Sequence, residues 1–209
     1  MEFRKGNRRK IINELKNFNF MKLLFYDLET TGLDKDKHGV YQMSGRIVID
    51  GSVVETFDFK VAPHNGAEYD DEALNVGHVS REEISNYPPM EEVFPQFIDM
   101  LNKYVNKYDK KNKFFLVGYN NRHFDDQFLR SFFERNGSKY FGSYFWSNSF
   151  DCLVLATPFL ASKRYLMVDF KQATVAKELG VKVDDVKLHD ASYDIELCAK
   201  IYDRVCGKY

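Results

Sequence analysis

Two acidic residues stand two positions apart at the end of an apolar segment, where Asp27 and Glu29 follow Leu23–Tyr26. A β-strand projects residues i and i+2 on the same side, so the two carboxylates converge on one point. Paired ionised carboxylates suit a hard divalent cation such as Mg²⁺ or Mn²⁺. An isolated pair of this kind is more often a strand that runs out into a solvated acidic turn. Further acids are therefore needed before the pair indicates a metal site.

Two more acidic clusters stand at the boundaries of predicted elements. Asp125 and Asp126 follow an apolar run at 114–117 and open a segment with helical spacing of apolar residues. His189 and Asp194 flank the first turn of the closing helical segment. Acids in the first turn of a helix are favoured by its N-terminal partial charge, and we assign Asp126 to this capping role. A histidine such as His189, taken alone, is more often a surface or packing residue.

Taken in order, the three clusters resemble the motifs of the DEDDh 3'-to-5' exonucleases of the ribonuclease-H-like superfamily. The motifs read Asp27-Leu28-Glu29, Asn121-Arg122-His123-Phe124-Asp125 and His189-Asp190-Ala191-Ser192-Tyr193-Asp194. The similarity continues through Gln42, Gly77-His78-Val79 and Asp151–Ala156, from about residue 22 to residue 206. The residues within these motifs are most similar to those of the bacterial exonuclease I and polymerase III proofreading-subunit groups. The exonuclease I enzymes are considerably longer than this chain.

This resemblance implies a centre of two divalent metal ions, Mg²⁺ or Mn²⁺. Their ligands would be Asp27, Glu29, Asp125 and Asp194, with Asp27 bridging both ions. Two such ions activate the attacking water, neutralise the phosphate and stabilise the leaving oxygen. His189 would act as the general base, because an unperturbed imidazole titrates near a pKa of about 6.5.

The turn after Glu29 is expected to hold the end of the substrate. Its hydroxyls and backbone amides can donate to a terminal 3' hydroxyl and phosphate, and its leucine offers an apolar surface for a base. Phe124 is equally compatible with a place in the core or in the cleft, where aromatic faces stack on bases without sequence preference. The predicted substrate-binding residues are Thr30, Thr31, Gly32, Leu33, Asn121 and Phe124.

The predicted activity is metal-dependent 3'-to-5' hydrolysis of phosphodiester bonds at the 3' end of single-stranded nucleic acid, with release of nucleoside 5'-monophosphates. DNA is weakly favoured over RNA, and a polymerase or repair protein is an expected partner. The main alternative is a catalytically silent adapter with the same fold. A haloacid-dehalogenase-like phosphohydrolase needs a second Asp where Glu29 stands, and a structural protein with a surface acidic cluster would not be stabilised by metal.

Composition limits the size and the surroundings of the protein. A chain of 209 residues with 44% hydrophobic content can bury a full core, and we expect one exonuclease domain over residues 21–209. The preceding basic extension, 1–20, carries six Lys or Arg and two Glu, whereas the remainder is net acidic. An acidic body predicts modest, salt-sensitive affinity for nucleic acid. Three widely spaced cysteines and no long apolar segment indicate a cytoplasmic protein that does not enter a membrane.

The apolar periodicity predicts an α/β, ribonuclease-H-like fold in three layers. Its mixed five-stranded sheet would contain three antiparallel strands followed by parallel strands, with helices on both sides. Ser80 and Glu83 form a capping box, and Pro95 limits where the next helix starts. Strands are expected at 22–28, 40–50, 53–62 and 114–118, and helices at about 125–136, 152–156 and 169–179 and in the closing segment.

Overall fold

The computed structural model describes residues 21–188 and 191–207 and contains one five-stranded sheet with strand order β3-β2-β1-β4-β5. The pairs β1–β2 and β2–β3 are antiparallel, and the pairs β1–β4 and β4–β5 are parallel. The predicted mixed sheet is therefore confirmed. The strands are β1 (Lys22–Thr30), β2 (Val40–Ile49), β3 (Ser52–Lys60), β4 (Phe114–Gly118) and β5 (Phe150–Asp151).

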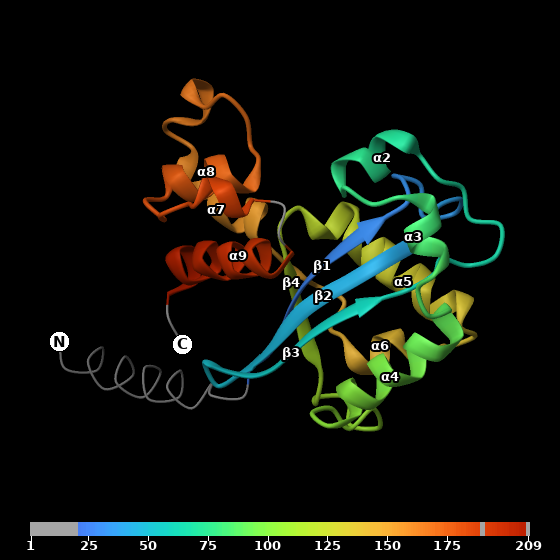
Figure 1. Ribbon diagram of the computed structural model, residues 1–209. Coiled ribbons are helices and arrows are strands. Elements are labelled where there is room, and N and C mark those ends of the chain that lie inside the picture. Colours follow the sequence, from blue (N-terminus) through green and yellow to red (C-terminus); the bar gives the residue numbers. More distant parts are fainter. Residues whose placement is uncertain (1–20, 189–190, 208–209) are drawn as a thin grey trace, which may run out of the picture.

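Helices cover both faces of this sheet, which gives the predicted three layers (Figure 1). Helices α4, α5 and α6 lie on one face, and α7, α8 and α9 lie on the other. The α-helices are α2 (Asp71–Val76), α3 (Arg81–Ser85), α4 (Met90–Asn102), α5 (Asp125–Arg135), α6 (Phe141–Tyr144), α7 (Cys152–Leu160), α8 (Gln172–Glu178) and α9 (Ala191–Cys206). Short 3₁₀ turns are η1 (Asn121–His123), η2 (Arg164–Leu166) and η3 (Asp185–Lys187).

The central strand β1 divides its side chains between two hydrophobic cores. Leu24, Tyr26 and Leu28 pack with α4 and α5, whereas Leu23 and Phe25 pack with α7, α8 and α9. This division follows from the two-residue period of a strand. Asp27 and Glu29 continue the row of Leu23 and Phe25, so the alternation directs both carboxylates toward the α9 side of the sheet.

Local sequence features account for the β2–β3 turn and for the start of α3. The turn between β2 and β3 places Asp50 at φ 50° and Gly51 at φ 76°, which is the geometry of a tight hairpin with two residues of positive φ. Ser80 caps α3 by accepting from the Glu83 amide at 3.1 Å, as predicted. The Glu83 carboxylate does not complete a capping box, because it accepts from the Tyr87 hydroxyl at 2.7 Å.

Three element boundaries differ from the sequence-based expectation. Helix α4 begins at Met90 and continues through Pro95, so the proline does not set its start. The helix predicted at 152–156 extends to Leu160, because the whole segment packs its apolar face under α9. Helix α8 covers only Gln172–Glu178, since the residues just before it form a loop rather than a helical turn.

The basic extension at 1–20 and the pair His189 and Asp190 lie outside the described residues. Among the helices that the structure describes, none has the length and apolar character to cross a membrane.

Candidate active site

Four carboxylates predicted as metal ligands come from three separate segments of the chain. Asp27 and Glu29 stand near the end of β1, on the side that faces α9. Asp194 lies in the first turn of α9, and Gln172 holds this turn by donating from Nε2 to the Asp194 backbone carbonyl at 2.6 Å. Asp125 opens α5 and is buried.

Parallel pairing explains how Asp125 reaches the other acids. Strand β4 runs beside β1, with Phe25 opposite Val117, so the chain leaves β4 close to the site. It then turns through η1 into α5, and the Asp125 Oδ1 atom accepts from the Leu28 amide at 3.1 Å. The Asp125 carboxylate is thus fixed to the backbone between Asp27 and Glu29.

The four carboxylates act on one another electrostatically. Burial raises the pKa of Asp27 from 3.8 to about 8, and the charges of Glu29 and Asp194 add to this shift. Burial also raises the pKa of Asp125 well above its ordinary value, with the charge of Asp27 as the next cause. The Leu28 amide opposes that rise by donating to the ionised form. The acids therefore repel one another in a partly buried site.

This donor set fits divalent cations in charge and in chemistry. All of its ligand atoms are hard oxygens, the type that Mg²⁺ and Mn²⁺ prefer. Mutual repulsion of the carboxylates would be relieved by bound cations. Within residues 21–188 and 191–207, no three acidic, histidine or cysteine side chains are gathered closely enough to hold a metal ion. The described carboxylates are thus electrostatically coupled without forming a finished ligand cage.

Tyr41 makes a contact with Glu29 that the sequence pattern did not reveal. The register of β1 and β2 shifts between Glu29 and Thr30, which makes Tyr41 the extra residue of a bulge. Its hydroxyl donates to the Glu29 Oε2 atom at 3.4 Å. Gly77 leaves space for this hydroxyl, because a Cβ atom there would lie 1.9 Å from it. The similarity at Gly77-His78-Val79 was the one available signal.

The turn after Glu29 is held by its own threonines. Thr31 is 0% exposed, and its hydroxyl donates to the Glu68 carbonyl at 2.6 Å and accepts from the Gly39 amide. The Thr30 hydroxyl donates to the Gly32 carbonyl at 2.8 Å. These bonds correct the expectation that both hydroxyls point toward a substrate, because the two groups stabilise the turn instead.

Two other predicted substrate residues do meet. Leu33 is 79% exposed, and it lines a hollow of about 320 Å³ together with Phe124 of the α5 N-terminus. His123 and Gln127 line the same hollow, and neither was predicted. Phe124 also packs on Phe128, with ring centroids 4.9 Å apart, so it belongs to the core and to the hollow at once. The hollow offers apolar faces on which a base can stack.

Asn121 and Asp126 differ from the sequence-based interpretation. Asn121 is 0% exposed and donates from Nδ2 to the Asp126 carboxylate at 3.0 Å, so it has no surface for a nucleotide. Asp126 is more than a helix cap, because it also accepts from the Tyr26 and Ser149 hydroxyls, each at 2.5 Å. Gly118 allows this arrangement, since a Cβ atom there would lie 2.6 Å from the Asn121 Cβ. Both residues build the loop that delivers Asp125.

The predicted general base, His189, lies outside the described residues. The described part of the motif continues from Ala191 into α9.

Comparison with known proteins gives one family and one fold. The family model for RNase T exonucleases matches residues 24–202. No curated protein matches the chain.

Solved structures of exonuclease I share the fold of this chain. The zinc-bound E. coli exonuclease I complex with single-stranded DNA aligns with a TM-score of 0.68 at 20% identity, over 88% of this chain and 40% of that one. The E. coli exonuclease I complex with a dT13 oligonucleotide aligns with a TM-score of 0.68 at 19% identity, over 88% and 41%. A complex of exonuclease I with SSB-Ct gives 0.66 at 19% identity, over 89% and 42%. The chain thus spans about two fifths of the length of these proteins.

Proposed function

The chain belongs to the DEDDh exonuclease family of the ribonuclease-H-like fold, and on this premise we propose that it is a metal-dependent 3'-to-5' exonuclease. Its substrate would be single-stranded nucleic acid with a free 3' end, and its products nucleoside 5'-monophosphates. The domain responsible would comprise residues 21–209, with 1–20 as a basic extension.

One observation carries the proposal. Asp27, Glu29, Asp125 and Asp194 arrive from three segments. Burial, followed by the charges of Glu29 and Asp194, raises the pKa of Asp27 to about 8, and burial and the charge of Asp27 raise the pKa of Asp125. A protein gains nothing in stability from gathering acids that repel one another in a partly buried site. Such an arrangement is expected where divalent cations balance the charge of the carboxylates and bind a phosphodiester.

Each residue of the centre has a proposed role. Asp27, Glu29, Asp125 and Asp194 would hold two divalent ions, with magnesium or manganese as the candidates. Bound in this way, such ions supply the charge and the water activation that in-line phosphodiester hydrolysis needs. His189 would accept the proton of the attacking water, and Tyr41 would hold the orientation of Glu29 through its 3.4 Å hydrogen bond.

The substrate's last nucleotide would enter the hollow between Leu33 and Phe124. Amides at Gly32 and Leu33 would donate to its 3' hydroxyl and phosphate. Solved relatives hold single-stranded DNA, which supports a single strand here and favours DNA weakly over RNA. One relative was solved with SSB-Ct, and a repair protein or polymerase is the class of partner we propose for this chain, which would act in the cytoplasm.

The test is digestion of 5'-labelled single-stranded DNA and RNA of one sequence, with Mg²⁺, Mn²⁺ or EDTA. Wild type should give a ladder that shortens from the 3' end only with metal. Asp27→Asn should give none, because it removes a charge from the ligand set. Asp50→Asn is the matched control: it removes the same charge in the β2–β3 turn, at a positive φ that Asn accepts.

Cleavage within the strand, or cleavage that persists in EDTA, would contradict the proposal. Wild type that binds both strands without cutting either would identify the catalytically silent adapter instead. A difference in rate between the two labelled strands would settle the sugar preference.

A further inference from the structure

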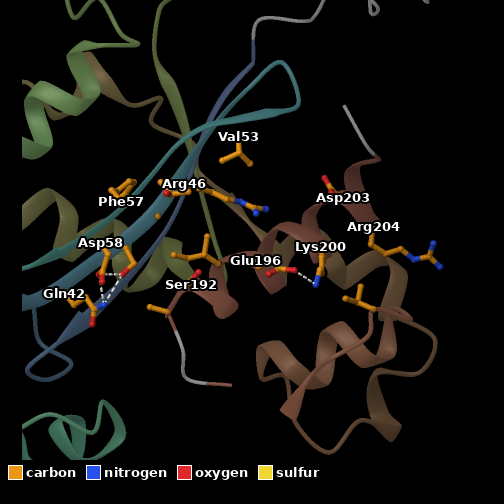
Figure 2. A pocket seen from close by; sticks show the side chains of 16 residues that line it. Gln42, Arg46, Val53, Phe57, Asp58, Ser192, Glu196, Lys200, Asp203 and Arg204 are labelled. Atoms are coloured by element: carbon orange, nitrogen blue, oxygen red, sulfur yellow. Dashed lines mark hydrogen bonds and ion pairs between the residues drawn. The ribbon is translucent and has the colours of Figure 1, made fainter. Parts of the chain in front are cut away.

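An open groove of about 1120 Å³ lies on the α9 face of the sheet (Figure 2). Strand β2 forms its floor with Gln42, Ser44 and Arg46, and strand β3 forms its outer wall. Helix α9 forms the opposite wall, because it packs over the row of Leu23, Phe25 and Val48 and leaves β3 uncovered. Nothing in the proposed chemistry uses this groove.

The groove begins beside the carboxylates. Glu29 pairs with Gln42 and Asp27 pairs with Ser44 across β1 and β2. Directly opposed residues of antiparallel strands share a face, so the floor continues the surface that carries the two acids. From Gln42 to Arg46 it extends about 13 Å along the strand. A strand whose 3' end is at Asp27 would therefore reach Arg46 by following this face of β2.

Arg46 is the one charged residue of the floor, and it forms no direct ion pair, although Asp203 and Glu196 of α9 attract it from a longer distance. Its guanidinium lies over the Phe25 ring, 5.1 Å from the centroid. The Nε atom is buried and has no hydrogen-bond partner, and the guanidinium forms no ion pair with any residue that the structure describes. Figure 2 shows the side chain reaching from the sheet toward α9. A partly buried cation with no carboxylate in direct contact favours an anionic ligand.

The acids of the groove already have partners within the protein. Asp58 accepts from Gln42 Nε2 at 2.7 Å and from Ser44 Oγ at 2.8 Å. Glu196 forms an ion pair with Lys200 at 2.5 Å, and Asp203 also interacts within the protein. The hydrogen bonds stabilise the Asp58 carboxylate in place, and Lys200 offsets the charge of Glu196 that an incoming phosphate would meet. Arg46 is thus the cation on the groove floor, with a buried Nε atom that has no hydrogen-bond partner.

We propose that Arg46 binds a backbone phosphate of the strand on the 5' side of the nucleotide being removed. This inference rests on the proposed exonuclease function. A guanidinium donates two parallel hydrogen bonds to phosphate oxygens, and such contacts position a strand without reading its sequence. The groove then serves as the track that presents successive 3' ends to the carboxylates.

The test measures the dissociation constant of a 5'-labelled oligonucleotide of about ten residues, a length within the usual range of single-strand sites, by fluorescence anisotropy in EDTA. Arg46→Gln should weaken binding about tenfold, the loss expected for one hydrogen bond to a charged group. The slope of log affinity against log salt should fall by about one phosphate contact. Hydrolysis of a dinucleotide, too short to reach Arg46, should stay at the wild-type rate and thereby report correct folding.

Arg130→Gln is the matched control, because Arg130 also lies over a ring, that of Phe141, but on the exposed side of α5. It should leave affinity for the oligonucleotide unchanged. Thr56→Glu tests the groove without touching Arg46. Thr56 is exposed and opposes Arg46 on β3, so a carboxylate there would compete with the phosphate. This variant should weaken binding as much as Arg46→Gln.

Affinities within twofold of wild type for both Arg46→Gln and Thr56→Glu would overturn the inference, as would failure of wild type to bind the oligonucleotide. If the protein is not an exonuclease, wild type will hydrolyse neither substrate. The anisotropy measurement still decides in that case whether Arg46 contacts the strand.

Discussion

Asp125 and Asp126 are neighbours in the first turn of α5, yet their surroundings are opposite. The Asp126 carboxylate accepts from Tyr26, Ser149 and Asn121 at 2.5, 2.5 and 3.0 Å. Asp125 accepts from the Leu28 amide, and burial and the charge of Asp27 raise its pKa. One carboxylate is satisfied by donors, and the other is opposed by a like charge.

The difference separates a residue that supports the fold from one that supports the chemistry. Three donors around Asp126 tie α5 to β1 and to the segment before β5, which fixes the direction of the helix start. The ionised form of Asp125 is unfavourable in its buried position unless a cation binds beside it. Two adjacent acids can thus be assigned to the fold or to the chemistry by whether the protein itself compensates their charge.

The largest effect is expected for Asp125→Asn. This variant keeps an acceptor for the Leu28 amide but removes a charge from the proposed ligand set. Activity should fall roughly a thousandfold, since metal-ion catalysis contributes several kcal/mol. The rate of 3'-end removal at saturating Mg²⁺ is the measurement. Activity within tenfold of wild type would show that Asp125 is not a ligand.

Asp126→Ala should affect stability instead of chemistry. The substitution leaves the buried Tyr26 hydroxyl and the Asn121 amide without an acceptor. The free energy of unfolding should fall by about 3 kcal/mol, as expected for two unsatisfied groups. Urea denaturation measures this loss, and Ser149→Ala, which removes one donor only, should cost about 1 kcal/mol. A stable but inactive Asp126→Ala protein would assign Asp126 to the chemistry and contradict the distinction from Asp125.

The pH dependence of stability in EDTA should sharpen the comparison. The pKa of Asp27 is about 8 in the folded protein and 3.8 ordinarily, so folding favours its protonated form. Its contribution to stability is complete below pH 4 and is lost as the pH rises to about 8. Asp27→Asn cannot ionise, so its melting temperature should exceed that of wild type at pH 8, by about 2–4 °C for each kcal/mol that ionisation of Asp27 costs, and match it near pH 4. A difference that shrinks with rising pH would mean that Asp27 is stabilised as a carboxylate.

Tyr41→Phe should have the smallest effect. It removes one long hydrogen bond, of 3.4 Å, to Glu29 and leaves the ring packing intact. Stability should change by less than about 1 kcal/mol, and the metal concentration for half-maximal activity should rise a fewfold. Metal titrations of the rate in wild type and variant give this value. An unchanged titration would show that Tyr41 does not position Glu29.

Much of the fold could be predicted because its signals are local. The alternation along Leu23–Glu29 assigns faces of β1, Asp50-Gly51 marks the hairpin, and Ser80 marks a helix start. The carboxylates of the site were predicted from motif order and their resemblance to a known family. These features depend on neighbours in the sequence or on residue types at short spacing.

The features that sequence analysis missed depend on distant pairings. Tyr26 and Asp126 are 100 positions apart, and no local pattern links them. Tyr41 reaches Glu29 only because of a bulge in the β1–β2 register. The burial of Asn121 follows from its packing against Gly118 and its bond to Asp126. Sequence spacing gives residue type and order, whereas these contacts depend on how the elements pack.

The central claim is that the repelling carboxylates form a metal centre, and the most direct measurement counts bound Mn²⁺ by electron paramagnetic resonance. Wild type should bind two ions per chain at pH 8, and Asp27→Asn should lose at least one of them, while Asp126→Ala, measured below its unfolding temperature, should retain both. Absence of bound Mn²⁺ in wild type, or equal binding by Asp27→Asn, would contradict the account.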